Sequence, residues 1–184
     1  MTDTVELIRR CKAGESAGFE QLYKTYYRVL YGIALRYSNS TAEAQDILQD
    51  SFIKVFNSIG HYQGDSSFEG WLKRIVQNTA INSYRSRLKF GLYVDISGQE
   101  LLQSDDGPAA LFESLEAREI VQLLNRMPEG YRLILNLYCI DGYSHKEIAQ
   151  MLTISEGTSK SQLFKAKNHL KSLIENQSKQ KIAG

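Results

Sequence analysis

Apolar side chains recur at spacings of three and four residues along most of the chain, and this period is that of an α-helix. The recurrence is clearest in three stripes, within residues 19–37, 48–59 and 68–79. Only two prolines, Pro108 and Pro128, occur in 184 residues, and no stretch alternates apolar and polar residues convincingly, as a half-buried strand does. The sequence therefore predicts an all-α fold.

The helical pattern fails in one place, the stretch VDISGQELLQSDDGPAA at 94–110. This stretch is acidic, rich in small residues and aperiodic, which is typical of a linker. We predict two small helical domains, 1–90 and 111–184, joined by a flexible acidic linker over 91–110. The second domain contains a helix-turn-helix pattern.

Charge is distributed unevenly along the chain, although the net charge is only +1. Residues 1–94 contain 12 Lys/Arg and 9 Asp/Glu, and residues 121–184 contain 9 Lys/Arg and 5 Asp/Glu. Residues 95–120 contain 1 Lys/Arg and 7 Asp/Glu. Each basic segment can meet phosphates, whereas DNA would repel the acidic one.

Nothing in the sequence predicts catalysis, a metal site or a cofactor. His61, His145 and His169 fall in separate predicted elements, and no Ser/His/Asp or glycine-rich phosphate-binding signature accompanies them. Cys11 and Cys139 lie far apart in apolar helical patterns, so we expect core or half-buried thiols. The charged start of the chain lacks the apolar core of a secretion signal. These features fit a cytoplasmic protein that is not an enzyme.

The helix-turn-helix pattern begins with Ser144 and Glu147, which form a capping-box sequence. A turn follows at 152–154, and Ser155 can cap the second helix. In this motif the second helix enters the major groove, where its first turns contact base edges and later lysines contact phosphates. The positions that we predict to face outward and bind DNA are Thr158, Ser159, Lys160, Gln162, Lys165 and Lys167.

Two segments together resemble a known family. AEAQDILQDSFIKVFNSIGHYQGDSSFEGWLKRIVQNTAINSYRSRLK, at 42–89, resembles the second conserved region of bacterial RNA polymerase sigma factors, most closely the extracytoplasmic-function (ECF) group of the sigma-70 family. LNRMPEGYRLILNLYCIDGYSHKEIAQMLTISEGTSKSQLFKAKNHL, at 124–170, resembles their fourth region. The resemblance implies a promoter-specificity subunit, with core RNA polymerase and promoter DNA as partners. It also implies control by an anti-sigma factor, which is common in the family.

The resemblance assigns a docking face to the predicted helix at 41–59. In the family, this face binds the clamp helices of the largest polymerase subunit. The residues alone would equally fit a solvated acidic face. The assigned residues are Asp46, Gln49, Asp50 and Ile53.

The loop at 60–67 and the helix after it match the family's surface for the downstream, single-stranded promoter element. In the family the loop captures a flipped base. Unstacking that base costs free energy, which stacking on the protein and hydrogen bonds to the base edge must offset. Tyr62 fits a stacking role and a core role equally, whereas Trp71 lies on the apolar stripe and is expected to pack in the core. The assigned residues are His61, Tyr62, Gln63, Asp65, Ser66, Lys73, Arg74, Gln77, Asn78, Asn82 and Arg85.

The chain departs from the family pattern at several assigned positions. Asn82 stands where aspartate is frequent, and Ser159 replaces a usual apolar residue, which is expected to loosen packing. Lysine or glutamine stands at three recognition-helix positions where arginine is frequent: Gln162, Lys165 and Lys167. Lysine lacks the fork with which arginine reads guanine, so the upstream element is expected to differ from the family's usual sequence.

A second hypothesis belongs to a different class. A stand-alone helix-turn-helix regulator, with an N-terminal dimerisation or sensing domain, would bind duplex operators without a polymerase. The polar and basic helix at 68–89, which follows a polar loop, argues against an N-terminal domain used only for dimerisation.

Overall fold

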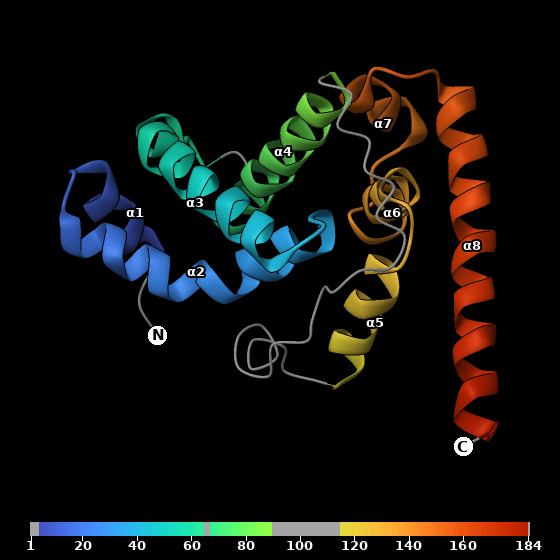
Figure 1. Cartoon of the computed structure of the whole chain (residues 1–184). Coiled ribbons are helices and arrows are strands. Elements are labelled where there is room, and N and C mark those ends of the chain that lie inside the picture. The colour runs from blue at the N-terminus through green and yellow to red at the C-terminus, as the bar shows by residue number, and fades with distance from the viewer. Residues whose placement is uncertain (1–3, 65–66, 90–114, 184) are drawn as a thin grey trace. The chain divides into compact units, whose positions relative to one another are not determined.

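The computed structural model describes residues 4–64, 67–89 and 115–183 (Figure 1). Every regular element within these ranges is helical, which confirms the predicted all-α class. The described residues divide between two compact units, of which the first comprises residues 1–38 and 42–83 and the second residues 39–41 and 84–184. Two domains are therefore confirmed, whereas their predicted limits remain a prediction, since the expected linker at 91–110 lies outside the described residues.

The first unit is built on four α-helices. α2 and α4 are its longest helices, and a short 3-10 helix, η1, continues α3 toward the loop that precedes α4. The elements are α1 (Thr4–Lys12), α2 (Ser16–Tyr37), α3 (Thr41–Ser58), η1 (Ile59–His61) and α4 (Phe68–Lys89). The first residue of α3 and residues 84–89 of α4 are counted with the second unit.

The predicted apolar stripes supply the core of the first unit. Leu22 and Leu30 of α2, Val55 of α3 and Leu72 and Val76 of α4 are fully buried. Because helical residues three or four apart lie on the same face, each stripe turns one side of its helix inward. Burial of such side chains contributes roughly 1.5–3 kcal/mol each, so these stripes account for much of the stability of the unit.

α1 packs closely on α2 because Gly18 has no side chain at the contact. A Cβ atom at Gly18 would lie 3.0 Å from the Cβ of Arg10 and 3.1 Å from the backbone N of Cys11. Arg10 continues the contact, because its Nε donates to Glu15 Oε2 at 2.8 Å. Cys11 is buried as expected, and burial raises the pKa of its thiol. This thiol is therefore a core group and not a reactive one.

The second unit holds the helix-turn-helix. A helical run formed by α6 and the π-helix η3 precedes the motif, and α8 extends beyond it to Ala183 (Figure 1). The elements are α5 (Leu115–Asn125), α6 (Glu129–Leu135), η3 (Asn136–Ile140), α7 (His145–Leu152) and α8 (Glu156–Ala183).

One core cluster joins α5, α6 and α8. It comprises Leu124, Met127, Leu135 and Ala166, with Leu170 packed against it. Leu137 of η3 and Ile148 of α7 are also fully buried. Cys139, in contrast, is exposed, so the expectation of a core or half-buried thiol there was wrong. The wider turn of the π-helix alters the helical register, and the 3.6-residue period used in the prediction does not apply to it.

Candidate nucleic-acid and protein interfaces

The helix-turn-helix has the caps that the sequence predicts. Ser144 and Glu147 form the capping box, in which the Ser144 amide donates to Glu147 Oε2 at 2.8 Å and the Glu147 amide donates to Ser144 Oγ at 3.3 Å. Thr153 is the C-cap of α7, and its φ of 58° places it in the left-handed region, which is uncommon for a β-branched residue. The Thr158 amide donates to Ser155 Oγ at 3.0 Å and so caps α8. These contacts fix the turn from which α8 projects.

α8 turns one face to the core and another to solvent. Leu163 and Ala166 are buried, as predicted. Lys167 is exposed, and its Nζ lies 5.8 Å from the centre of the Tyr138 ring, within the range of a cation–π contact. Among the six predicted DNA-binding residues of α8, those that lie exposed are Thr158, Lys160, Lys165 and Lys167, while Gln162 is half-buried.

The outward placement of Ser159 was wrong, because this side chain is fully buried. Its Oγ lies 2.9 Å from His145 Nδ1 of α7. The Tyr138 ring stacks on the His145 ring, with centroids 4.5 Å apart. Ser159 precedes Leu163 by four residues and therefore shares its inward face. Its polarity suggested an outward position, but a hydrogen bond to histidine satisfies it in the core.

We expect His145→Phe to lower the free energy of unfolding by about 1–3 kcal/mol, since it keeps the ring stack but leaves the Ser159 hydroxyl buried without this partner. The double variant His145→Phe/Ser159→Ala should recover much of that loss, because both polar groups are then gone. Thermal or denaturant unfolding of the single and double variants measures the difference. Ser161→Ala, at an exposed position of α8, is the control. Equal losses in the single and double variants would remove this role for the pair.

The predicted docking face on α3 is fully outward. Asp46, Gln49, Asp50 and Ile53 are all exposed, and Ile53 retains 51% of its accessible surface. The buried residues of α3 lie on the other side of the helix and include Ile47. Two carboxylates beside a large exposed apolar side chain are a composition suited to a protein partner.

An aromatic groove lies beside this docking face, between α2 and α3. Its lining includes Tyr23 and Tyr27 of α2 and Phe52 and Phe56 of α3, together with Gln49 and Ile53 from the docking face itself. The Tyr23 and Phe52 ring centroids are 4.7 Å apart. Burial raises the pKa of Tyr23, with a smaller contribution from Tyr27, so its phenol stays neutral. The four-residue spacing of Tyr23 and Tyr27 was the signal that sequence reasoning missed.

The loop after η1 combines packed and exposed side chains. Tyr62 is half-buried, and its ring centroid lies 5.2 Å from those of both Phe68 and Trp71. The core role of Tyr62 is therefore favoured, and the packing expected of Trp71 is observed. His61 and Gln63 are exposed, while the predicted residues Asp65 and Ser66 lie outside the described residues.

A contact from α1 reaches this loop and was not foreseen from the sequence. Lys12 Nζ donates to the Tyr62 carbonyl at 2.7 Å. The two residues are 50 positions apart, so no sequence pattern pointed to the contact. It ties the N-terminal helix to the loop after η1.

The outer face of α4 matches the prediction in part. Arg74, Asn78 and Asn82 are exposed, whereas Arg85 is half-buried. Lys73 is half-buried and pairs with Glu69 at 2.6 Å, which partly offsets its charge. This surface is polar and moderately cationic.

Gln77 corrects the prediction for α4, because it is only 7% exposed. It directly follows the core residue Val76 and lies close to Thr79 and Ala80, which are also buried. α4 thus buries a wider face than a single stripe, and the core includes a glutamine that we had assigned to the DNA-binding surface.

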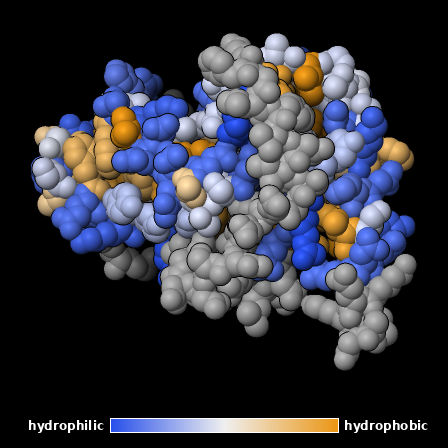
Figure 2. All heavy atoms as spheres, in the orientation of Figure 1, coloured by the Kyte–Doolittle hydropathy of each residue, from blue (hydrophilic) through white to orange (hydrophobic). Residues whose placement is uncertain are grey.

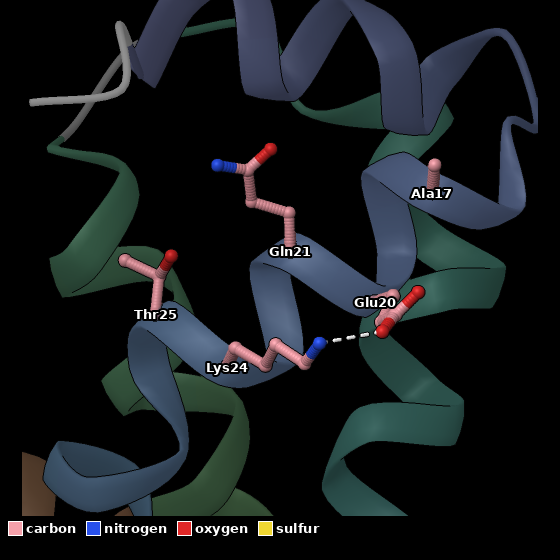
Figure 3. A pocket seen from close by; sticks show the side chains of 5 residues that line it. All are labelled: Ala17, Glu20, Gln21, Lys24 and Thr25. Carbon is pink, nitrogen blue, oxygen red and sulfur yellow. Dashed lines mark hydrogen bonds and ion pairs between the residues drawn. The ribbon is translucent and has the colours of Figure 1, made fainter.

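A shallow hollow on α2, lined by five residues and shown in Figure 3, contains the ion pair between Lys24 and Glu20 at 2.6 Å. The hydrogen bond from Lys24 lowers the pKa of Glu20. Within the described ranges no cluster of three or more His, Cys, Asp or Glu side chains could hold a metal ion. In the same ranges no helix is both long and apolar enough to span a membrane.

The visible surface is mainly hydrophilic, with hydrophobic residues in small patches (Figure 2). A capped helix-turn-helix and a separate helical unit with a polar, partly cationic helix define a DNA-binding protein of two domains. Comparison with protein families makes this class specific, because residues 22–89 match Sigma-70 region 2 and residues 117–170 match Sigma-70, region 4.

Relatives that match most of the chain specify its group within this family. The RNA polymerase sigma-H factor of Pseudomonas aeruginosa is 31% identical over 172 residues, which cover 88% of this chain and 89% of the relative. The ECF RNA polymerase sigma-E factor of Salmonella typhimurium is 30% identical, with 95% of each chain covered. The chain belongs to the extracytoplasmic-function group of the sigma-70 family. It is a promoter-specificity subunit of bacterial RNA polymerase, and the stand-alone regulator is not favoured.

A solved structure supports the fold alone. The sigma factor RpoE of Bartonella quintana, solved in complex with the anti-sigma factor NepR, is 23% identical with a TM-score of 0.54. The match covers 85% of this chain and 96% of that one.

Proposed function

We propose that three separate surfaces of the protein act in promoter recognition. The exposed face of α3 binds core RNA polymerase, the loop after η1 and the outer face of α4 bind the downstream element as a single strand, and α8 reads the upstream element as a duplex. The observation that carries the proposal is that each surface lies on a different element and consists mainly of exposed side chains that the core does not use.

The α3 surface suits docking to another protein. Asp46 and Asp50 provide negative charge, which complements basic partner residues and favours the correct register. Ile53 and the aromatic groove beside it supply apolar area, and an interface needs such area at its centre. The groove thus extends the docking surface beyond the four residues that the sequence assigned.

The loop and α4 suit an unpaired strand. Arg74 attracts backbone phosphates, and Asn78 and Asn82 provide amides that can both donate and accept hydrogen bonds to base edges. Tyr62 packs against Phe68 and Trp71, so its role is to support the loop, while His61 and Gln63 face solvent beside it. We retain Asp65 and Ser66 as candidates for binding the flipped base.

Recognition by α8 rests on lysines and not on arginines. Lys160, Lys165 and Lys167 bind phosphates as point charges and set the position of the helix on the duplex. Gln162 can pair with adenine through both of its amide groups. We therefore expect the upstream element of this protein to depend less on guanine than the elements that arginine-rich recognition helices read.

Regulation by an anti-sigma factor belongs to the same proposal, as does action in the cytoplasm, where core polymerase works. The Bartonella quintana sigma factor was solved with such a partner. We propose that an anti-sigma factor covers part of the α3 docking face and the groove, and so competes with polymerase.

Reconstitution tests the proposed function. The full chain is mixed with bacterial core RNA polymerase, and thymine reactivity reports strand opening across a promoter library. We expect opening that requires both components, and the selected fragments then yield both promoter elements. No association with polymerase and no opening by the mixture, together with tight duplex binding by the free chain, would instead support the stand-alone regulator.

The free chain should bind duplex promoter DNA poorly. Neither basic segment carries a large positive excess, since residues 1–94 contain 12 Lys/Arg and 9 Asp/Glu and residues 121–184 contain 9 Lys/Arg and 5 Asp/Glu, so few counterions are released on binding. Binding isotherms at two salt concentrations, with and without core polymerase, measure the contrast. A specific, tight complex of the free chain with duplex DNA would contradict this expectation.

A further inference from the structure

The backbone at Tyr62 is held at several points, although the residue lies in a loop. Its amide donates to the Ile59 carbonyl at 3.1 Å, and its ring packs against those of Phe68 and Trp71. Its carbonyl accepts a hydrogen bond from Lys12 Nζ at 2.7 Å. The first two attachments come from η1 and α4, which flank the loop, whereas the third comes from the last residue of α1. Loops are usually more mobile than the elements they connect, so this segment is unusually well restrained.

α1 is a firm support for the Lys12 side chain. Leu7 and Cys11 are each only 2% exposed, so α1 is fixed against the rest of the unit. Cys11 directly precedes Lys12, and its backbone lies against Gly18 of α2. α1 also contacts η1 directly. A donor on so well packed a helix restrains the loop, because the helix does not follow the motion of the loop.

The hydrogen bond from Lys12 fixes a whole peptide unit. A peptide unit is planar and trans, and no cis peptide bond occurs in the described ranges. The Tyr62 carbonyl and the Gln63 amide therefore share one plane and point in opposite directions. The next residue, Gly64, has a φ of 87°, which glycine adopts freely. Gln63 thus lies between a fixed peptide plane and a turn of the backbone.

The restrained segment carries residues of the proposed downstream surface. His61 and Gln63 lie on either side of Tyr62 in the sequence, and both are exposed. A side chain that reads a base must be held within about 0.5 Å of its productive position by the residues around it. A residue that fixes the backbone between His61 and Gln63 therefore affects base preference, even if it does not contact the DNA itself.

We infer that Lys12 is a positioning residue for the downstream element, because its hydrogen bond to the Tyr62 carbonyl holds His61 and Gln63 in place to contact bases of the single strand. The inference rests on the proposed role of this loop and deepens it. Lys12 is exposed, and a direct bond to a phosphate is the alternative use of its charge. The geometry favours positioning, because the amine already donates to the carbonyl.

Lys12→Met tests the inference, because it keeps the apolar stem and removes the donor. Holoenzyme is titrated into labelled single strands that contain the selected downstream element, or the same element with one base replaced. The unchanged chain should prefer the selected base, and Lys12→Met should reduce this preference by about fivefold at one position, as expected for one hydrogen bond. Lys12→Arg keeps a charged donor and should restore most of the preference.

Lys24→Met is the matched control, because it removes the same charge from an exposed position of α2. It should bind every strand as the unchanged chain does. Thermal unfolding confirms that each variant folds, and affinity for core polymerase without DNA should be the same for all of them. Hydrogen exchange in the free chain should be faster at residues 62–64 of Lys12→Met and unchanged there in Lys24→Met.

The outcomes separate this inference from the proposed function. Arg74→Ala should weaken binding to all strands, and no effect would count against α4 as part of the DNA-binding surface. If the unchanged holoenzyme prefers one base and Lys12→Met keeps the full preference, Lys12 does not position the loop, while the proposed surface stands. No base preference in the unchanged holoenzyme would overturn both.

The salt dependence of binding distinguishes positioning from a direct phosphate contact. Positioning leaves the slope of log affinity against log salt unchanged in Lys12→Met. An equal loss for all strands, with a slope smaller by about 0.7, would show that Lys12 binds the DNA backbone directly and would overturn the inference.

Discussion

Charge reversal at Asp46 and Asp50, as Asp46→Lys/Asp50→Lys, is expected to weaken binding to core RNA polymerase by at least about 100-fold. Both carboxylates are exposed on α3, so the fold does not depend on their charge. In the proposed interface they face basic residues of the partner, and reversal replaces attraction with repulsion. Titration of labelled protein with core polymerase measures the affinity.

A matched control separates this effect from a general change in charge. Glu6→Lys/Glu20→Lys makes the same change in net charge at two exposed positions of the same unit, paired with Arg9 and Lys24. Exposed ion pairs contribute little to stability, so this control should fold and bind polymerase normally. Unchanged polymerase affinity in a folded Asp46→Lys/Asp50→Lys variant would remove the docking role of α3.

Truncation of Ile148 is expected to produce the largest loss of stability in the helix-turn-helix unit. Its side chain is 0% exposed, at the centre of α7. Ile→Ala substitutions at such sites cost about 2–5 kcal/mol, a large fraction of the stability of a small domain. Hydrogen exchange should therefore show faster exchange across α7 and α8, and binding should lose its dependence on the upstream element.

Ile140→Ala is the control, because the same side chain is removed at a position that is 44% exposed. A surface change of this kind is expected to cost within about 0.5 kcal/mol. Polymerase binding through α3 should survive both substitutions if the two units fold independently. Slow exchange in α7 of Ile148→Ala would show that the unit tolerates the cavity, and faster exchange throughout α3 would show that the two units unfold together.

The sequence alone determined the helical class, the two-domain division, the caps of α7 and α8 and the outward face of α3. Each of these follows from local spacing, because three- and four-residue periods and capping residues act within one or two turns. Family membership could also be inferred from contiguous motifs, and the matches to Sigma-70 region 2 and Sigma-70, region 4 bear it out.

Only the tertiary structure decided the places of polar residues that a neighbouring helix can satisfy. Ser159 and Gln77 look outward by polarity, yet both are buried, and a histidine 14 positions away accepts or donates the hydrogen bond of Ser159. The contact of Lys12 with the Tyr62 carbonyl and the aromatic groove between α2 and α3 likewise join distant segments. Burial depends on what packs against a face, and the period of one helix specifies the face but not its neighbour.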